Sequence, residues 1–332
     1  MKTMLKRWAL GVALLAMPFV LASCGSQTEG DMEGGASGGA AGKPTLKIGY
    51  LPITHAAPLY IEDELAKREP ERFKNFNLEL VKFGSWPDLI DAVNAGQVDG
   101  ASVLVELAMQ ARGQGIPIKA VALGHREGNV IVAAPDIKTA ADFKGKTFAI
   151  PNKFSTHNIL LYQMLKQAKI PYEDVNVVDL APAEMPAALA QGRIAGYSVA
   201  EPFGANAVVL KKGKTLFQSG DLWKGSICCV LVLQEKLIKD KPAMIQEFIE
   251  GYAEAGKRAE TKDEKVRNIM RRYMKVDDEV LNLSLEWISY EDLKLDQQSY
   301  GELKDYLAEM KLSKNLPSYE EFVDPTLLDR GK

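Results

Sequence analysis

The stretch that decides the fold is Ala92-Val93-Asn94-Ala95-Gly96-Gln97-Val98-Asp99-Gly100-Ala101-Ser102-Val103, and a divergent copy of it recurs at 188–199. In each copy a first glycine, Gly96 or Gly192, lies where the end of a helix favours a positive φ. A second glycine, Gly100 or Gly196, precedes small and apolar residues that predict a buried strand. The copies lie 96 residues apart. This spacing is too long for a solenoid repeat and predicts two similar α/β lobes.

The composition is typical of a soluble globular protein. The 332 residues suffice for two α/β lobes. The hydrophobic fraction of 46% and the charged fraction of 26% are ordinary. A net charge of −3 without a basic run argues against nucleic acid as a partner. Three cysteines in a chain of this length do not predict a disulfide framework.

The N-terminal segment predicts export rather than part of the fold. Basic residues precede an apolar run at 8–21 that is short for a membrane span and ends at Leu21-Ala22-Ser23-Cys24. This ending resembles the lipobox of bacterial lipoproteins, which implies a signal peptide at 1–24 and a lipid on Cys24. The alternative is a plain signal peptide with an incidental cysteine. Residues 25–44, rich in Gly, Ser and Ala, predict a flexible tether. We therefore expect an exported chain anchored in the periplasm or at the outer face of the plasma membrane.

The order of elements predicts two doubly wound lobes. In the first, strands are expected at 45–50, 78–83, 98–105 and 118–123, and in the second at 147–150, 175–180 and 194–200. Two crossover strands, 130–134 and 228–233, are expected to join the lobes. Lobe 1 would then hold residues 45–129 and 230–332, and lobe 2 residues 130–229. Four helices at 241–257, 263–274, 277–287 and 298–310 are expected to pack on lobe 1.

The carboxyl ends of the strands predict a binding site in a cleft between the lobes, because parallel α/β sheets bind ligands there. Helix starts with free N–H groups favour a small anionic ligand. The candidate residues are Thr54, His55, Trp86, Ser102, Asn129, Ser155, Thr156, His157 and Glu201.

Each candidate also has a purely structural explanation. Thr54 and Ser155 are suited to helix caps, Trp86 to the core and Ser102 to close packing. Glu201, which precedes a proline, is also suited to a hinge or to the surface. We interpret His125 and Arg126, in a polar stretch between two strands, as solvated or hinge residues.

The sequence predicts no catalytic residue, cofactor or metal. The three histidines are isolated along the chain, and no zinc-ligand spacing, nucleophile elbow or phosphate-binding loop is present. Cys228 and Cys229 are adjacent in an apolar strand, which predicts buried thiols. A vicinal disulfide is the alternative.

Several motifs together carry a resemblance to a known family. They are Lys47-Ile48-Gly49-Tyr50-Leu51-Pro52, Ser85-Trp86, the repeat at 95–100, Phe143-Lys144-Gly145-Lys146-Thr147, Gly196–Phe203 and Gly220-Asp221-Leu222-Trp223. The stretch 45–256 resembles the solute-binding proteins of ABC importers for nitrate, bicarbonate, taurine, alkanesulfonates and the thiamine pyrimidine precursor. The resemblance implies a two-lobed periplasmic-binding-protein-like fold of type II and anion contacts at Trp86, Asn129, Thr156 and His157. Where nitrate-type members have a lysine, this chain has Ile227-Cys228-Cys229-Val230.

The resemblance implies a function in solute uptake. A monomeric, lipid-anchored protein would capture a small solute by lobe closure and deliver it to ABC permease and ATPase subunits. A pyrimidine-precursor binding protein, an enzyme of pyrimidine synthesis or the menaquinone pathway, and a lipoprotein sensor or adhesin are the alternatives. The export signal and the lack of a catalytic constellation argue against the enzyme.

Overall fold

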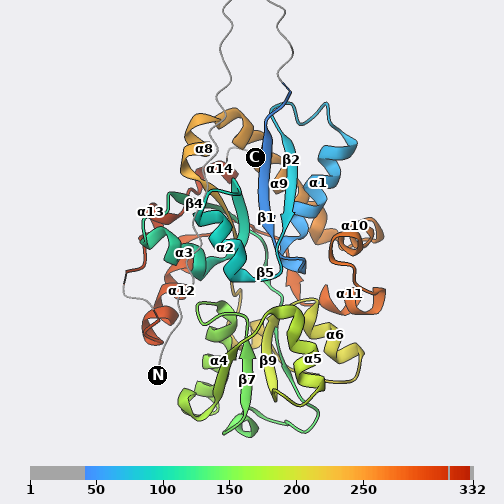
Figure 1. Cartoon of the computed structure of the whole chain (residues 1–332), viewed down its shortest axis with the longest axis vertical. Helices are drawn as coiled ribbons and strands as arrows, with labels where there is room; N and C mark the ends of the chain where they lie inside the picture. The colour runs from blue at the N-terminus through green and yellow to red at the C-terminus, as the bar shows by residue number, and fades with distance from the viewer. Residues whose placement is uncertain (1–41, 313–314, 330–332) are drawn as a thin grey trace, which may run out of the picture. The chain divides into compact units, whose positions relative to one another are not determined.

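The computed structural model describes residues 42–312 and 315–329 (Figure 1). The predicted signal peptide, Cys24 and nearly all of the predicted tether lie outside these residues. From Lys43 onward the described residues form one compact unit. No helix among them is long and apolar enough to cross a bilayer.

The first sheet combines four strands from the start of the compact unit with one strand that follows the second sheet in the sequence. Its order is β2-β1-β3-β11-β4, with β1 parallel to β2 and β3, and with β11 antiparallel to β3 and β4. The strands are β1 (Thr45–Tyr50), β2 (Asn77–Lys82), β3 (Gly100–Leu104), β4 (Ile118–Leu123) and β11 (Cys229–Gln234). Their helices are η1 (Thr54–Ala56), α1 (Ala57–Arg68), α2 (Trp86–Asn94) and α3 (Val105–Gly113).

The second sheet repeats this arrangement. Its order is β10-β6-β9-β7-β8, with β7 parallel to β8 and β9, and with β6 antiparallel to β9 and β10. The strands are β6 (Asn129–Ala133), β7 (Thr147–Ile150), β8 (Asn176–Asp179), β9 (Gly196–Ala200) and β10 (Lys214–Gln218). The helices are η2 (Ala140–Phe143), α4 (Thr156–Gln167), η3 (Tyr172–Asp174), η4 (Pro182–Glu184), α5 (Met185–Ala190), α6 (Phe203–Val209) and α7 (Ser219–Leu222). The two sheets confirm the predicted α/β architecture of two similar halves.

Each of the two glycine positions of the repeat requires glycine for the same structural reason in both halves. Gly96 and Gly192 have φ of 65° and 70° after their helices, as expected for glycine at a helix end. A Cβ on Gly100 would lie 2.4 Å from the Val232 carbonyl oxygen, and one on Gly196 would lie 2.8 Å from that of Val132. Each second glycine therefore lets the antiparallel strand, β11 or β6, approach closely.

The chain passes between the sheets twice. Residues 124–128 lead from β4 to β6 and include the short β5 (Arg126–Glu127), which pairs with β12 (Ile288–Ser289). Residues 223–228 lead back from α7 to β11. The strands of the first sheet come from 45–123 and 229–234, and those of the second from 129–218. The exact lobe boundary stays a prediction.

The C-terminal helices pack against both halves of the molecule. They are α8 (Glu235–Asp240), α9 (Pro242–Thr261), α10 (Glu264–Met274), α11 (Asp278–Ser284), α12 (Gln297–Glu309), α13 (Tyr319–Phe322) and α14 (Thr326–Asp329). Helices α9 and α10 pack on α1, as expected. Helix α11 instead packs on α6 of the second half, so the expectation that all four long helices lie on lobe 1 is wrong for this one.

Candidate functional site

All nine predicted binding residues are buried, with exposed fractions of at most 3%. Buried polar side chains normally have hydrogen-bond partners, so each of them needs an explanation. They divide into side chains that join the two halves, side chains with a structural partner, and side chains without a hydrogen bond.

Two threonines join the halves. Thr54 follows β1, and both its backbone N–H (2.9 Å) and its hydroxyl (3.1 Å) donate to the Glu201 carbonyl oxygen at the end of β9. The N-cap of η1 is Ile53, so the structure corrects the prediction of Thr54 as a cap. Thr156, the first residue of α4, lies 2.6 Å from a Glu106 carboxyl oxygen and 2.7 Å from the Ile227 carbonyl oxygen.

The protonation of Glu106 explains how Thr156 makes both contacts. A hydroxyl has a single proton to donate, and the Ile227 carbonyl can only accept. Burial raises the pKa of the Glu106 carboxyl to about 8. A protonated carboxyl donates to the Thr156 hydroxyl, which in turn donates to Ile227. The contact across the two halves is therefore a chain of hydrogen bonds without a net charge.

Two other candidates have structural partners for their side chains, and a third lies within a strand. Ser155 is the N-cap of α4, accepts from the Asn158 N–H and donates to the Asn152 carbonyl, so its side chain is fully used by the helix start. The Glu201 carboxyl accepts from the Ala205 N–H (2.8 Å) and from the Ser284 hydroxyl of α11 (3.4 Å). Burial raises the pKa of Glu201 to about 7. Ser102 lies within β3, paired with Leu231 of β11.

Four candidates keep polar atoms without hydrogen-bond partners among the described residues. One is Glu201, whose Oε1 has no partner although its Oε2 has two. The others are the indole N–H of Trp86, both amide atoms of Asn129 and both ring nitrogens of His157. Each such atom costs about 1–3 kcal/mol when it is left without a partner. Burial, followed by the charges of His55 and His125, lowers the pKa of His157 to about 3. His157 is therefore neutral, with one donor and one acceptor to offer.

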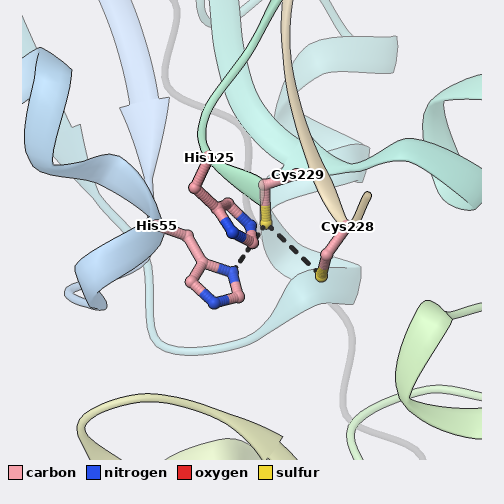
Figure 2. Close-up of side chains that lie close together, drawn as sticks. All are labelled: His55, His125, Cys228 and Cys229. Atoms are coloured by element: carbon pink, nitrogen blue, oxygen red, sulfur yellow. Dashed lines mark hydrogen bonds between the residues drawn. The ribbon is translucent and has the colours of Figure 1, made fainter. Parts of the chain in front are cut away.

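Four other side chains form a compact group (Figure 2). We call His55, His125, Cys228 and Cys229 the His/Cys cluster. The Cys229 Sγ lies 3.5 Å from His55 Nδ1 and 3.9 Å from the Cys228 Sγ. The two imidazole rings stack with centroids 3.4 Å apart. All four residues are fully buried, and their potential ligand atoms lie within 4.8 Å of one another.

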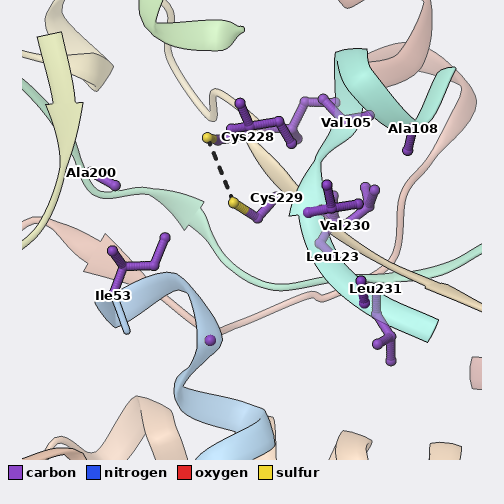
Figure 3. Packing of buried hydrophobic residues seen from close by; sticks show 14 of the residues in the cluster. Ile53, Val105, Ala108, Leu123, Ala200, Cys228, Cys229, Val230 and Leu231 are labelled. Atoms are coloured by element: carbon purple, nitrogen blue, oxygen red, sulfur yellow. Dashed lines mark hydrogen bonds between the residues drawn. The ribbon is translucent and has the colours of Figure 1, made fainter. Parts of the chain in front are cut away.

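The cluster corrects one interpretation of the sequence and confirms another. His125 is buried against His55 rather than solvated, and burial lowers its pKa to about 4. Cys228 and Cys229 are the predicted buried thiols, free rather than disulfide-bonded, with apolar neighbours such as Ile53 and Val230 (Figure 3). The expectation of no metal site rested on spacing along the chain. In the folded chain, side chains up to 174 residues apart come together.

Sequence reasoning missed the roles of Glu106, His125 and the two cysteines. One signal was available for His125. It follows strand β4 by two residues, close to the carboxyl end where other candidates were sought. Glu106 gave the same signal, because it follows strand β3 by two residues. The cysteines gave no comparable signal, because β11 runs antiparallel and brings its first residues to that same end.

The comparison with protein families assigns the chain. The NMT1-like family matches residues 39–273, well over half of the sequence. The chain belongs to the NMT1-like family. Several of its relatives and structural neighbours are named as solute-binding proteins of import systems, and other relatives as ATP-binding proteins of nitrate or bicarbonate import.

Three similar proteins serve as examples. A crystal structure of the ligand-binding component of an ABC-type import system from Staphylococcus aureus, with zinc bound, is 41% identical. Its TM-score is 0.82, over 87% of this chain and 99% of that one. A putative aliphatic sulfonates-binding protein of Escherichia coli is 29% identical over 54% of this chain and 58% of its own. A nitrate/nitrite binding protein of Nostoc is 28% identical over 66% and 55%.

The curated relatives are longer than the matched region. The NMT1-like chain spans a little over half of these two binding proteins, and only 34% and 32% of the first curated relatives that it matches.

Proposed function

We propose that this chain is the extracytoplasmic solute-binding component of an ABC importer. Its solute would be a small oxoanion, an organic sulfonate or a nitrate-like anion, held between the two halves and passed to a permease. The polar atoms of Trp86, Asn129 and His157 that lack partners carry this proposal, because all of them follow or begin strands of the two sheets. The indole and amide N–H groups and a neutral imidazole are donors that sulfonate or nitrate oxygens accept.

The contacts between the halves support closure around a solute. Thr54 with Glu201 and Thr156 with Glu106 connect the two halves through buried hydrogen bonds. Such bonds have to break for the site to open to solvent, which is how a hinged protein captures and releases its ligand.

The candidate residues offer no charged partner for an anion. None of the nine candidate residues is a lysine or an arginine, and the nearby Glu106 is held uncharged by burial. An anion would therefore be held by hydrogen bonds from neutral donors. We expect a preference for singly charged anions, because each further charge raises the cost of burial.

The solute is tested by thermal denaturation with nitrate, bicarbonate, taurine, alkanesulfonates and a thiamine pyrimidine precursor. A ligand at 100 times its dissociation constant stabilises the folded chain by about 2.7 kcal/mol. Trp86→Phe removes the indole N–H together with part of the ring and is expected to weaken the best ligand about tenfold. Trp223→Phe is the matched control, because its indole N–H already donates to Glu302. Stabilisation by the pyrimidine precursor alone, or equal effects of both substitutions, would contradict the oxoanion proposal.

Anchoring is tested separately. If Cys24 carries the lipid, the Cys24→Ser chain is released from the membrane fraction of the producing cell. Cys228→Ser, which alters a buried thiol, should leave the chain in that fraction. Membrane association that survives Cys24→Ser contradicts lipidation at this residue.

A further inference from the structure

The His/Cys cluster has the donor set of a metal centre. Two imidazoles and two thiols from four positions converge within 4.8 Å, on residues that are fully buried. Nitrogen and thiolate sulfur in equal number are typical of tetrahedral zinc sites. Purely hydrophobic packing does not account for the histidines, because the buried His125 interacts with the Cys229 thiol and stacks on the His55 ring.

The distances are close to those of a tetrahedral site. With bonds of about 2.0–2.3 Å, neighbouring ligand atoms around zinc lie roughly 3.3–3.8 Å apart. The two separations in the cluster are 3.5 Å, from His55 Nδ1 to the Cys229 Sγ, and 3.9 Å, between the two sulfurs. Binding would also require the stacked rings of His55 and His125, whose centroids lie 3.4 Å apart, to separate so that both direct a nitrogen to the ion.

A backbone carbonyl orients His55 as a ligand. Its Nε2 lies 3.2 Å from the Gly128 carbonyl oxygen, which can only accept a hydrogen bond. Nε2 therefore carries the proton, and the lone pair is on Nδ1, the atom that faces the Cys229 Sγ. Metal-binding histidines usually donate their second ring N–H to a carbonyl or carboxylate in this way.

We propose that His55, His125, Cys228 and Cys229 together bind one borderline-soft divalent cation of the Zn²⁺ class. His55 would bind through Nδ1 and the cysteines as thiolates, whose protons are released to solvent when the ion enters. Hard cations such as Mg²⁺ and Ca²⁺ are excluded, because they require oxygen ligands. The inference does not depend on which solute the protein carries.

The test uses the full-length chain, freed of metal and kept reduced with a phosphine. Zn²⁺ is titrated against a chromophoric chelator, and Co²⁺ serves as a spectroscopic probe. We expect one Zn²⁺ per chain, and with Co²⁺ the intense d–d bands of a tetrahedral site together with a thiolate-to-cobalt charge-transfer band. Cys229→Ser and His55→Gln are each expected to weaken Zn²⁺ binding by at least about 100-fold. Cys24→Ser, which removes the remaining cysteine, is the matched control and should bind as the parent does.

The Co²⁺ spectrum of the parent chain decides the question even if a variant fails to fold. A spectrum without the charge-transfer band overturns the proposal. So does Zn²⁺ binding that persists in Cys229→Ser and His55→Gln, or that is lost in Cys24→Ser, because the ion would then lie elsewhere.

Discussion

The Thr156 hydroxyl lies 2.6 Å from a carboxyl oxygen of Glu106, and this single contact joins helix α4 of one half to helix α3 of the other. Thr156→Val keeps the shape of the side chain but leaves buried polar atoms of Glu106 and Ile227 without a partner. We expect a loss of about 1–3 kcal/mol in the free energy of unfolding. Chemical denaturation measures it, with Thr215→Val in strand β10 as the control. Equal losses in the two variants would show that Thr156 contributes no more than an ordinary threonine.

Replacing either of the two close-packed glycines of the repeat by alanine is expected to destabilise the folded chain to a similar extent. Gly100→Ala and Gly196→Ala place a Cβ against a strand carbonyl at 2.4 and 2.8 Å, which backbone movement alone can relieve. Each should cost about 1–3 kcal/mol of unfolding free energy. Gly84→Ala, where a Cβ would have no neighbour within 4 Å, should change it by less than about 0.5 kcal/mol. A tolerated alanine at either repeat position would mean that the adjacent strand is free to shift.

Buried titrating groups predict that stability falls as pH rises above about 6.5, where only the carboxyls still titrate. The carboxyls of Glu106 and Glu201 have pKa values of about 8 and 7, above the ordinary 4.5, so the folded chain holds protons that the unfolded chain has released. The free energy of unfolding therefore falls as pH rises from 4.5 towards 8. His125 and His157, with pKa values of about 4 and 3 instead of 6.5, act in the opposite sense. Their contribution makes stability rise with pH up to about 6.5.

Above pH 6.5 the carboxyls of Glu106 and Glu201 determine how the free energy of unfolding changes with pH. Between pH 6.5 and 8 we expect a loss on the order of 2 kcal/mol in the unfolding free energy. Glu106→Gln, which cannot ionise, should remove most of that loss. Urea denaturation at a series of pH values measures it, and a flat profile in the parent chain would show that Glu106 ionises as it does in water.

Arg126 ties strand β5 to the segment before α12. Its guanidinium donates to the Asp292 and Lys294 carbonyl oxygens and pairs with Asp296 at 3.0 Å. A lysine cannot reproduce these directions. We expect Arg126→Lys to cost about 1–3 kcal/mol of unfolding free energy, since several partly buried acceptors lose their donor. Thermal denaturation measures this loss. Arg193→Lys, on an exposed turn after α5, is the control and should leave the unfolding free energy unchanged.

Local sequence signals were sufficient for most of the fold. Strands at Thr45–Tyr50 and Ile118–Leu123 have the predicted bounds, because alternating or continuous apolar residues end at a proline or glycine turn. The repeat predicted two halves because its glycines have local reasons to be there. The position of α11 was not predictable in this way, because it depends on which distant surface, that of α6, its apolar face meets.

The candidate site was predictable only where it follows local rules. Residues after strand ends, such as His55 and Trp86, could be found from the order of elements. The partners of those residues could not. Whether His125 meets His55 depends on how β1 and β4 are placed in the sheet, with β3 and β11 between them. Whether Cys229 faces both depends on the antiparallel direction of β11, which no pattern in the strand itself reveals.

The His/Cys cluster takes His125 from the outward connection between the sheets, Cys228 from the return connection and Cys229 from the start of β11, with His55 beside them on η1. If the proposed closure takes place, the two connections that would have to bend both contribute a side chain to this cluster. A ligand that cross-links these side chains would then stiffen the hinge, so that occupancy of the cluster and restriction of the movement between the halves would be the same event.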